Sequence, residues 1–260
     1  FNLEEMKKQI SEAFKEIPKG DVPPSKIPEV KEFPSDKVQL ISKDDVNQSI
    51  ILIGHLGGLM NNPDYFALEV MNNILGGGFS SRLFKRVRSE QGLAYDVFGV
   101  YSSNFDHEGL FYLGCSTKSE NTLKGIKSLL REMDDIRKTE VTDEELATAK
   151  DMYLNSFVFN FDSRSQIIYR LMELEYFKYP GNFLEITKKN IEKVSKADIL
   201  RVAQKYLQPD KIRIIVLGNP KDFDGKLDEL GKVHDIDIAI PGSPNPASGT
   251  IKAPTPGQSR

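Results

Sequence analysis

The sequence has little of what a metal centre, a disulfide framework or a membrane span requires. Its 260 residues include one cysteine, three histidines and no tryptophan. The single cysteine, Cys115, excludes an internal disulfide, and the apolar run 110–115 around it indicates a buried, unreactive thiol. No stretch reaches the roughly 18 consecutive apolar residues of a membrane-spanning helix. The formal net charge of −3, with mixed signs throughout, lacks the basic field that indicates nucleic-acid binding.

The histidines do not have the spacing of a zinc site. His107 is followed by Glu108, as in the His-Glu-x-x-His helix motif, but Phe111 stands where the second histidine is needed. The residues after His55, Leu-Gly-Gly-Leu-Met, do not match the inverted motif, and His234 stands alone. We therefore expect no metal site in this chain.

Residues 75–95 are the most informative stretch: Leu-Gly-Gly-Gly-Phe-Ser-Ser-Arg-Leu-Phe-Lys-Arg-Val-Arg-Ser-Glu-Gln-Gly-Leu-Ala-Tyr. The three glycines allow positive φ angles and predict a sharp turn. Ser80 or Ser81 can then accept a hydrogen bond from the first free N–H groups of a short helix. Gly92 suits the left-handed residue that ends such a helix, and a strand follows from Tyr95.

Within that helix, Leu83, Phe84 and Val87 are expected on one apolar face. Arg88 in its last turn and Tyr95 on the following strand are two polar groups that this geometry could aim at one place. Two other interpretations apply. A phosphate-binding loop is disfavoured, because residues 65–75 have helical rather than strand spacing and no Gly-Lys-Ser/Thr ending is present. A purely structural helix–loop–helix is left open by local physics.

The stretch resembles the second, zinc-free half of pitrilysin/insulinase-type metallopeptidases, a group that includes the mitochondrial processing peptidases. The resemblance rests on residues 75–84, Val-Arg at 87–88 and Gly-Leu-Ala-Tyr at 92–95, and extends more loosely over 38–218. It implies that Arg88 and Tyr95 face a zinc ion across a chamber and contact the substrate backbone or the reacting carbonyl. It also implies a chamber loop formed by Gly76, Gly77, Gly78, Phe79 and Ser80.

The chain order predicts an α+β fold. Two strands, two helices around the glycine loop, two strands, several helices and a last strand suit a mainly antiparallel sheet with helices packed on one face. We expect a helix over 1–17 that continues from a preceding half, a proline-rich linker over 18–35 and the peptidase-family domain over 36–220. Residues 221–260 are expected to form an extended tail, mobile or draped over the domain.

The region between 119 and 206 has helical spacing almost throughout. Thr142-Asp-Glu-Glu145 is a capping box that opens one of these helices. The helix over 162–176 has a wide apolar face. An aromatic cluster precedes it, and buried aromatic side chains commonly dominate a core, so we expect packing there rather than a substrate-lining surface. The cluster consists of Tyr153, Phe157, Phe159 and Phe161.

Two functions follow from the resemblance. In the first, this chain is the non-zinc half of a clamshell metallopeptidase: it closes the chamber, binds peptide substrates and supplies Arg88 and Tyr95 as donors to the oxyanion. In the second, it is a non-catalytic assembly subunit, like family members that serve structurally in respiratory complexes. The presence of both side chains favours the first. Zinc is expected only on the partner half, whether in the same polypeptide or a separate subunit, so this chain alone should be inactive. The compartment is left open between the bacterial cytoplasm and periplasm.

Overall fold

The computed structural model describes residues 1–18, 20, 27–28, 30 and 37–238. Most of the expected linker and the end of the expected tail, 239–260, therefore lie outside the described residues. The chain divides into two units, Phe1–Phe33 and Pro34–Arg260, and each is described by itself.

The first unit contains helix α1 (Leu3–Ala13), which the sequence predicted. Its cap is Asn2, whose Oδ1 accepts hydrogen bonds from the backbone N–H groups of Glu4 and Glu5 at 2.9 and 3.3 Å. Both glutamates also lie at the positive end of the helix dipole. No residue of α1 is buried.

The second unit is built on a six-stranded sheet with the order β4-β6-β2-β7-β1-β8. The pairs β4–β6, β6–β2 and β2–β7 are antiparallel, whereas β7–β1 and β1–β8 are parallel. The strands are β1 (Val38–Ser42), β2 (Gln48–Leu56), β4 (Ala94–Tyr101), β6 (Leu110–Lys118), β7 (Arg213–Gly218) and β8 (Val233–Asp235). A separate two-stranded sheet joins β3 (Gly58–Leu59) and β5 (Ser103–Asn104).

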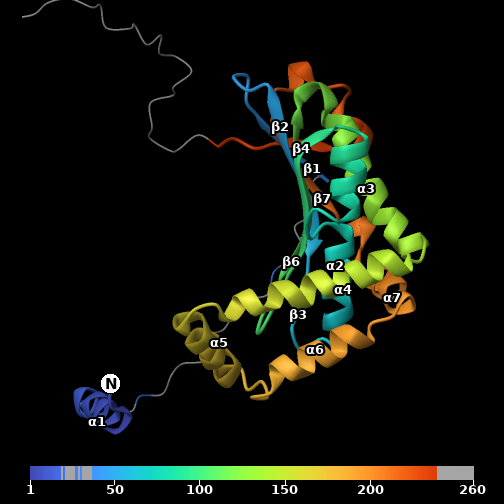
Figure 1. Ribbon diagram of the computed structural model, residues 1–260. Coiled ribbons are helices and arrows are strands. Elements are labelled where there is room, and N and C mark those ends of the chain that lie inside the picture. The colour runs from blue at the N-terminus through green and yellow to red at the C-terminus, as the bar shows by residue number, and fades with distance from the viewer. Residues whose placement is uncertain (19, 21–26, 29, 31–36, 239–260) are drawn as a thin grey trace, which may run out of the picture. The chain divides into compact units, whose positions relative to one another are not determined.

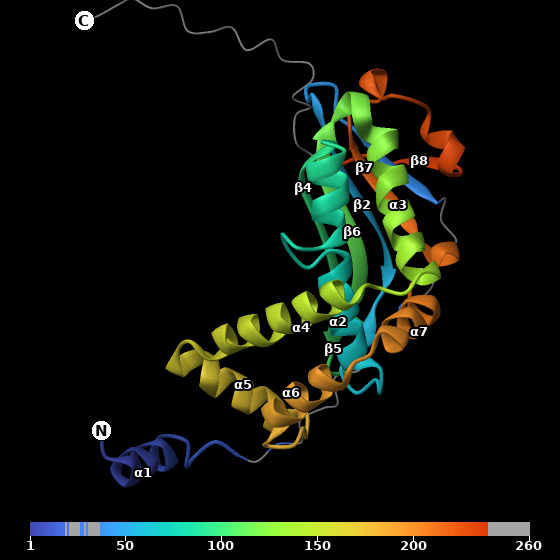
Figure 2. The ribbon, with the colours of Figure 1, turned by 45° about the vertical axis from the view of Figure 1, so that its right-hand side comes forward.

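Helices connect these strands, and some of them cover one face of the large sheet (Figure 1, Figure 2). The connecting helices are α2 (Tyr65–Leu75), η1 (Leu83–Glu90), η2 (Ser119–Asn121), α3 (Thr122–Lys138), α4 (Asp143–Phe157), η3 (Val158–Phe161), α5 (Arg164–Tyr176), α6 (Phe183–Lys193), α7 (Lys196–Tyr206) and η4 (Pro209–Lys211). The predicted α+β class, mainly antiparallel with helices on one face, is confirmed. None of the described helices is long and apolar enough to cross a membrane.

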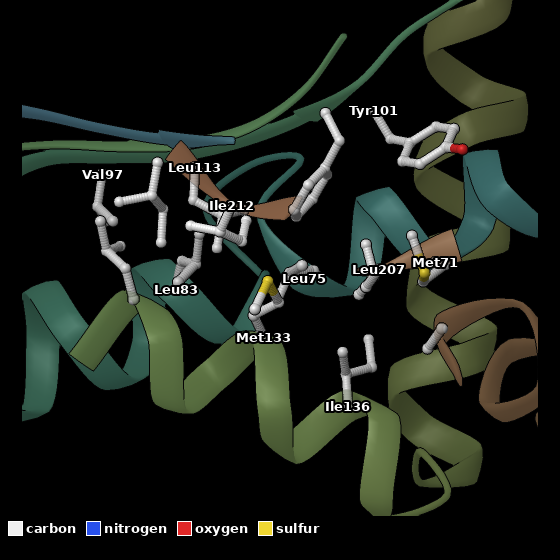
Figure 3. Close-up of a cluster of buried hydrophobic side chains, with 14 of the residues drawn as sticks. Met71, Leu75, Leu83, Val97, Tyr101, Leu113, Met133, Ile136, Leu207 and Ile212 are labelled. Atoms are coloured by element: carbon white, nitrogen blue, oxygen red, sulfur yellow. The ribbon is translucent and has the colours of Figure 1, made fainter. Parts of the chain in front are cut away.

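The core lies between the sheet and the helices α2, η1 and α3. In Figure 3, Leu75 and Leu83, from either side of the glycine loop, lie in one cluster with Leu113 of β6 and Met133 of α3. Cys115 is buried beneath the same helices, and burial raises the pKa of its thiol to about 12. The prediction of a buried thiol is therefore confirmed.

The folded domain extends beyond residue 220, where the sequence interpretation ended it. Two 3₁₀ helices, η5 (Pro220–Asp222) and η6 (Leu227–Leu230), lead to β8, which pairs with β1. Asp224 accepts hydrogen bonds from the backbone N–H groups of Leu123 and Lys124 at 2.7 and 3.1 Å, so this segment also caps α3. A strand of three residues has too little periodicity to be recognised in a sequence.

Helices α4, α5 and α6 extend away from the sheet in both ribbon views, and we call them the arm (Figure 1, Figure 2). The apolar face predicted for α5 is not buried: of its residues, only Leu174 is. The aromatic cluster is also not a closed core. Tyr153, Phe157 and Phe161 are half-buried, with successive ring centroids 5.9 and 5.7 Å apart, and Phe159 is 67% exposed.

Candidate functional site

The glycine loop runs against the free edge of strand β4. The N–H of Gly99 donates to the carbonyl of Gly76 at 3.0 Å, and a Cβ on Gly76 would lie only 2.3 Å from that nitrogen. Gly76 has a φ of −149°, so close approach rather than a left-handed conformation requires glycine there. Of the three glycines expected to turn the chain, only Gly78 has a positive φ, at +156°. The loop therefore covers an edge strand that would otherwise be open to pairing.

After the glycines, the loop has one exposed residue and then contacts helix α4. Phe79 is 80% exposed, whereas the Ser80 hydroxyl donates to the sulfur of Met152 on α4 at 2.8 Å. Ser81, one of the two predicted caps, accepts a hydrogen bond from the N–H of Phe84 at 3.3 Å.

Helix η1 is a π-helix, which the sequence did not predict. Leu83 and Val87 are buried in the core, as expected, but Phe84 is half-buried at its margin. The Phe84 ring stands edge-on to that of Phe79, with centroids 5.0 Å apart. The helix ends before Gly92, whose φ of +62° confirms the expected left-handed residue.

Tyr95 occupies a β-bulge at the start of β4. Ala94 pairs with Thr117 and Asp96 with the next residue, Ser116, so Tyr95 has no partner across the ladder. A bulge bends its strand and redirects the extra side chain. Tyr95 is accordingly 81% exposed rather than packed in the core.

Arg88 and Tyr95 meet at this surface. The Arg88 Cζ lies 4.7 Å from the centroid of the Phe84 ring and 5.5 Å from that of Tyr95. A guanidinium at such distances is attracted by the ring faces. Within the described part of the chain Arg88 has no carboxylate partner, in contrast to Arg82 and Arg86 on the same segment, each of which pairs with a glutamate. The N–H donors of Arg88 are therefore not occupied by a carboxylate of the described residues.

Both side chains line an open hollow of about 460 Å³. Polar groups from β2, β6 and η2 complete its lining: Gln48, Ser116, Lys118 and Asn121. Sequence reasoning did not find these residues, because their only common property is their position in the fold.

The three histidines do not fit a zinc ion. The Nδ1 of His55 lies 2.6 Å from the Leu56 carbonyl, and its Nε2 accepts from the N–H of Gln208 at 3.1 Å. His107 contacts side chains in its own turn, and His234 is exposed on β8. Over residues 37–238 and the shorter described stretches, no group of three or more histidine, cysteine or acidic residues could hold a metal ion.

This architecture and its glycine loop define a class of protein. The family model described as "Peptidase M16 inactive domain" matches residues 1–153, more than half of the chain, and the chain belongs to this family. The resemblance seen in the sequence to the zinc-free half of such peptidases is thereby confirmed.

The chain is also similar to individual proteins, whose names differ in whether they describe a peptidase. An uncharacterised zinc protease of Streptomyces coelicolor is 28% identical over 201 residues, which are 76% of this chain and 42% of that protein. A Helicobacter pylori protein named a non-peptidase homolog is 24% identical over 223 residues, 85% of this chain and 50% of the relative. The chain thus spans about half the length of these relatives.

Among solved structures, a peptidase M16 inactive domain from Pseudomonas fluorescens superimposes with a TM-score of 0.64 and 25% identity. The match covers 74% of this chain and 46% of that one. The similarity therefore extends from the sequence to the arrangement of the sheet and its helices.

Proposed function

We propose that this chain is the substrate-contacting half of a two-part zinc peptidase, whose zinc ion and zinc ligands belong to another half. That half either precedes this one in the same polypeptide or is a separate subunit. Two observations support the proposal: relatives about twice as long are named zinc proteases, and no metal-binding group occurs in the described residues.

The observation that carries the proposal is the pairing of Arg88 with Tyr95. The guanidinium lies over the rings of Phe84 and Tyr95 and pairs with no carboxylate of the described residues, so its N–H donors remain available to a ligand. The Tyr95 hydroxyl adds another donor on an exposed side chain. Donors fixed before the reaction stabilise the negative charge that develops on a carbonyl oxygen under attack. The pair would hold a peptide carbonyl in this way.

The face of the sheet opposite α2 and α3 suits the rest of an extended peptide. Ile50 and Ile215 are 51% and 39% exposed on it, and the rings of Phe98 and Tyr112 meet edge-on with centroids 6.0 Å apart. Apolar side chains of a bound peptide would remove this surface from water. Closure of the zinc-bearing half over this face would form the chamber.

The test combines this chain with its zinc-bearing half and measures turnover of an internally quenched peptide. Tyr95→Phe removes one hydroxyl and should lower kcat by about 10²–10³. Arg88→Ala should lower kcat and also raise KM, because it deletes a charge and several donors. Melting temperatures should stay near that of the unmodified chain, since both side chains are at the surface.

Matched controls are Tyr169→Phe on α5 and Arg131→Ala on α3, which change exposed residues of the same types elsewhere. They should change neither turnover nor stability. Normal turnover in both site variants would refute the assigned role.

A second candidate is a non-catalytic assembly subunit of the same family. The name of the Helicobacter pylori relative, a non-peptidase homolog, favours it. In that case the combined halves would hydrolyse no peptide, and Arg88→Ala or Tyr95→Phe would at most weaken association of the halves, measured by sedimentation.

A further inference from the structure

Six side chains of η1 and of the residue before it lie in three rows at a spacing of four residues. Leu83 and Val87 make the buried row, and Phe84 and Arg88 make the exposed row beside Tyr95. Arg82 and Arg86 make a third row, in which each guanidinium pairs with a carboxylate of another helix. Because adjacent residues belong to different rows, rotating the helix by one position would turn Arg88 away from Tyr95.

The most buried of these ion pairs joins η1 to the start of the arm. Arg82 is only 6% exposed, and its Nε and Nη2 donate to Oε1 and Oε2 of Glu145 at 2.6 and 2.9 Å. This is the two-point geometry that fixes a guanidinium in orientation as well as in distance. The corresponding pair, Arg86 with Glu132 at 2.8 Å, has an arginine that is 37% exposed.

Glu145 is itself held by a second set of bonds. In the predicted capping box of α4, its Oε2 accepts from the N–H of Thr142 at 2.8 Å, and its own N–H donates to the Thr142 hydroxyl at 3.1 Å. Burial alone would raise the pKa of Glu145, but the hydrogen bonds from Arg82 and Thr142 outweigh it and lower the pKa to about 2. The carboxylate therefore stays charged and fixed at the foot of the arm.

We propose that Glu145, through Arg82, is a positioning residue that sets the rotation of η1 and so holds Arg88 against Tyr95. The importance of that placement for catalysis rests on the proposed function, whereas the placement itself can be observed without a substrate. Because Glu145 belongs to α4, a displacement of the arm would also change the placement of Arg88.

Glu145→Gln isolates this role, because a glutamine can still accept from the Thr142 N–H in a capping box but loses the charge that Arg82 contacts. Thr142→Ala is the matched control: it weakens the same cap and leaves the carboxylate for Arg82. An effect that came only from a weakened start of α4 would therefore appear in Thr142→Ala at least as strongly as in Glu145→Gln.

The readout is the Arg88 Nε–Hε resonance in NMR spectra of the chain without peptide, since the rings of Phe84 and Tyr95 shift it. Glu145→Gln should move this resonance toward the position it has in Tyr95→Ala, and should speed hydrogen exchange of the η1 amides by about tenfold or more relative to those of β2. Thr142→Ala should leave the Arg88 resonance in place. Arg82→Lys, which keeps the charge and loses the two-point contact, should reproduce the shift of Glu145→Gln.

An unchanged Arg88 resonance in a folded Glu145→Gln chain would overturn the proposal, and so would an equal shift in Thr142→Ala. Should Glu145→Gln not fold, Arg82→Lys decides by the same criteria. The test is separate from the turnover experiment: normal turnover in both Arg88→Ala and Tyr95→Phe would refute the proposed function and leave this spectroscopic result standing.

Discussion

Helices α3 and α5 both have repeated apolar residues in the sequence, yet nine of the 17 residues of α3 are buried and only one of the 13 in α5 is. Helix α3 lies along the sheet, where Ile126, Leu129 and Met133 join the core, whereas α5 lies at the end of the arm (Figure 2). Exposed on α5 are Ile167, Ile168, Tyr169, Leu171, Met172 and Tyr176.

The difference shows that apolar spacing predicts a helix more reliably than it predicts burial. A helix with a narrow apolar stripe has one face to cover, and the sheet covers that of α3. Helix α5 has apolar residues around much of its circumference, such as the consecutive Ile167, Ile168 and Tyr169, and the described residues bury only Leu174. Its apolar surface therefore contributes little to the stability of the domain.

The largest expected difference between the region beneath α3 and the surface of α5 is in the rate of thiol labelling. Cys115 is 2% exposed beneath α3, and burial raises its pKa to about 12, whereas Ile168 on α5 is 57% exposed. In Ile168→Cys, the new cysteine should react with a thiol reagent at least about 10³ times faster than Cys115, which requires unfolding to be reached. Mass spectrometry of digested, time-sampled protein measures both rates in one molecule. Similar rates would mean that the packing of α3 on the sheet opens as readily as the arm.

Removing the same side chain from each helix should have unequal effects. Leu129 in α3 is fully buried, so Leu129→Ala should lower the free energy of unfolding by about 2–5 kcal/mol. Leu171 in α5 is 52% exposed, so Leu171→Ala should change it by no more than about 0.5 kcal/mol. Urea unfolding followed by circular dichroism compares the two. A loss of several kcal/mol at Leu171 would show that another surface covers α5 in solution.

The smallest expected effect is on the free energy of unfolding when Glu145, at the start of the arm, is replaced by glutamine. The folded-state pKa of Glu145, about 2, lies below its usual 4.5. Its stabilising contribution is therefore present above pH 4.5 and is lost as the pH falls toward 2. Glu145→Gln should be less stable than the unmodified chain by about 1–3 kcal/mol at pH 7, the value of a charged hydrogen bond, and this gap should shrink in acid.

The unmodified chain and Glu145→Gln must be compared at each pH. Burial raises the pKa of Glu132, and this gives the free energy of unfolding a pH dependence of opposite sign. The contribution of Glu132 is present below its usual pKa and is lost as the pH rises through the folded value. It is common to both chains and cancels in the difference. If the difference in free energy of unfolding between the two chains were the same from pH 7 to pH 3, the charge of Glu145 would not stabilise the fold.

Several features could be predicted from local sequence because neighbouring residues produce them. Asn2 caps α1, Thr142 and Glu145 form a capping box, and Gly92 ends η1 in a left-handed conformation. Each depends on hydrogen bonds or φ angles within a few residues. The convergence of Arg88 and Tyr95 was predictable for the same reason, since only the end of η1 and one turn separate them.

Other features depend on contacts between distant segments. Gly76 is needed because the backbone of Gly99 comes within bonding distance, and Tyr95 is exposed because β4 bulges against β6. The partner of Arg82 lies 63 residues away. No local pattern specifies such neighbours, so neither the π-helical form of η1 nor its anchoring could be read beforehand.

The sequence by itself determined the order of the main strands and helices, the α+β class, the family and the closeness of Arg88 to Tyr95, because periodicity, caps and turns act over one or two helical turns. Only the tertiary structure decided which apolar faces are covered, that β8 extends the sheet, and that Glu145 holds the helix bearing Arg88. A side chain can be buried, or can form a buried ion pair, only against another segment of the chain. Such a neighbouring segment is in place only after the chain has folded.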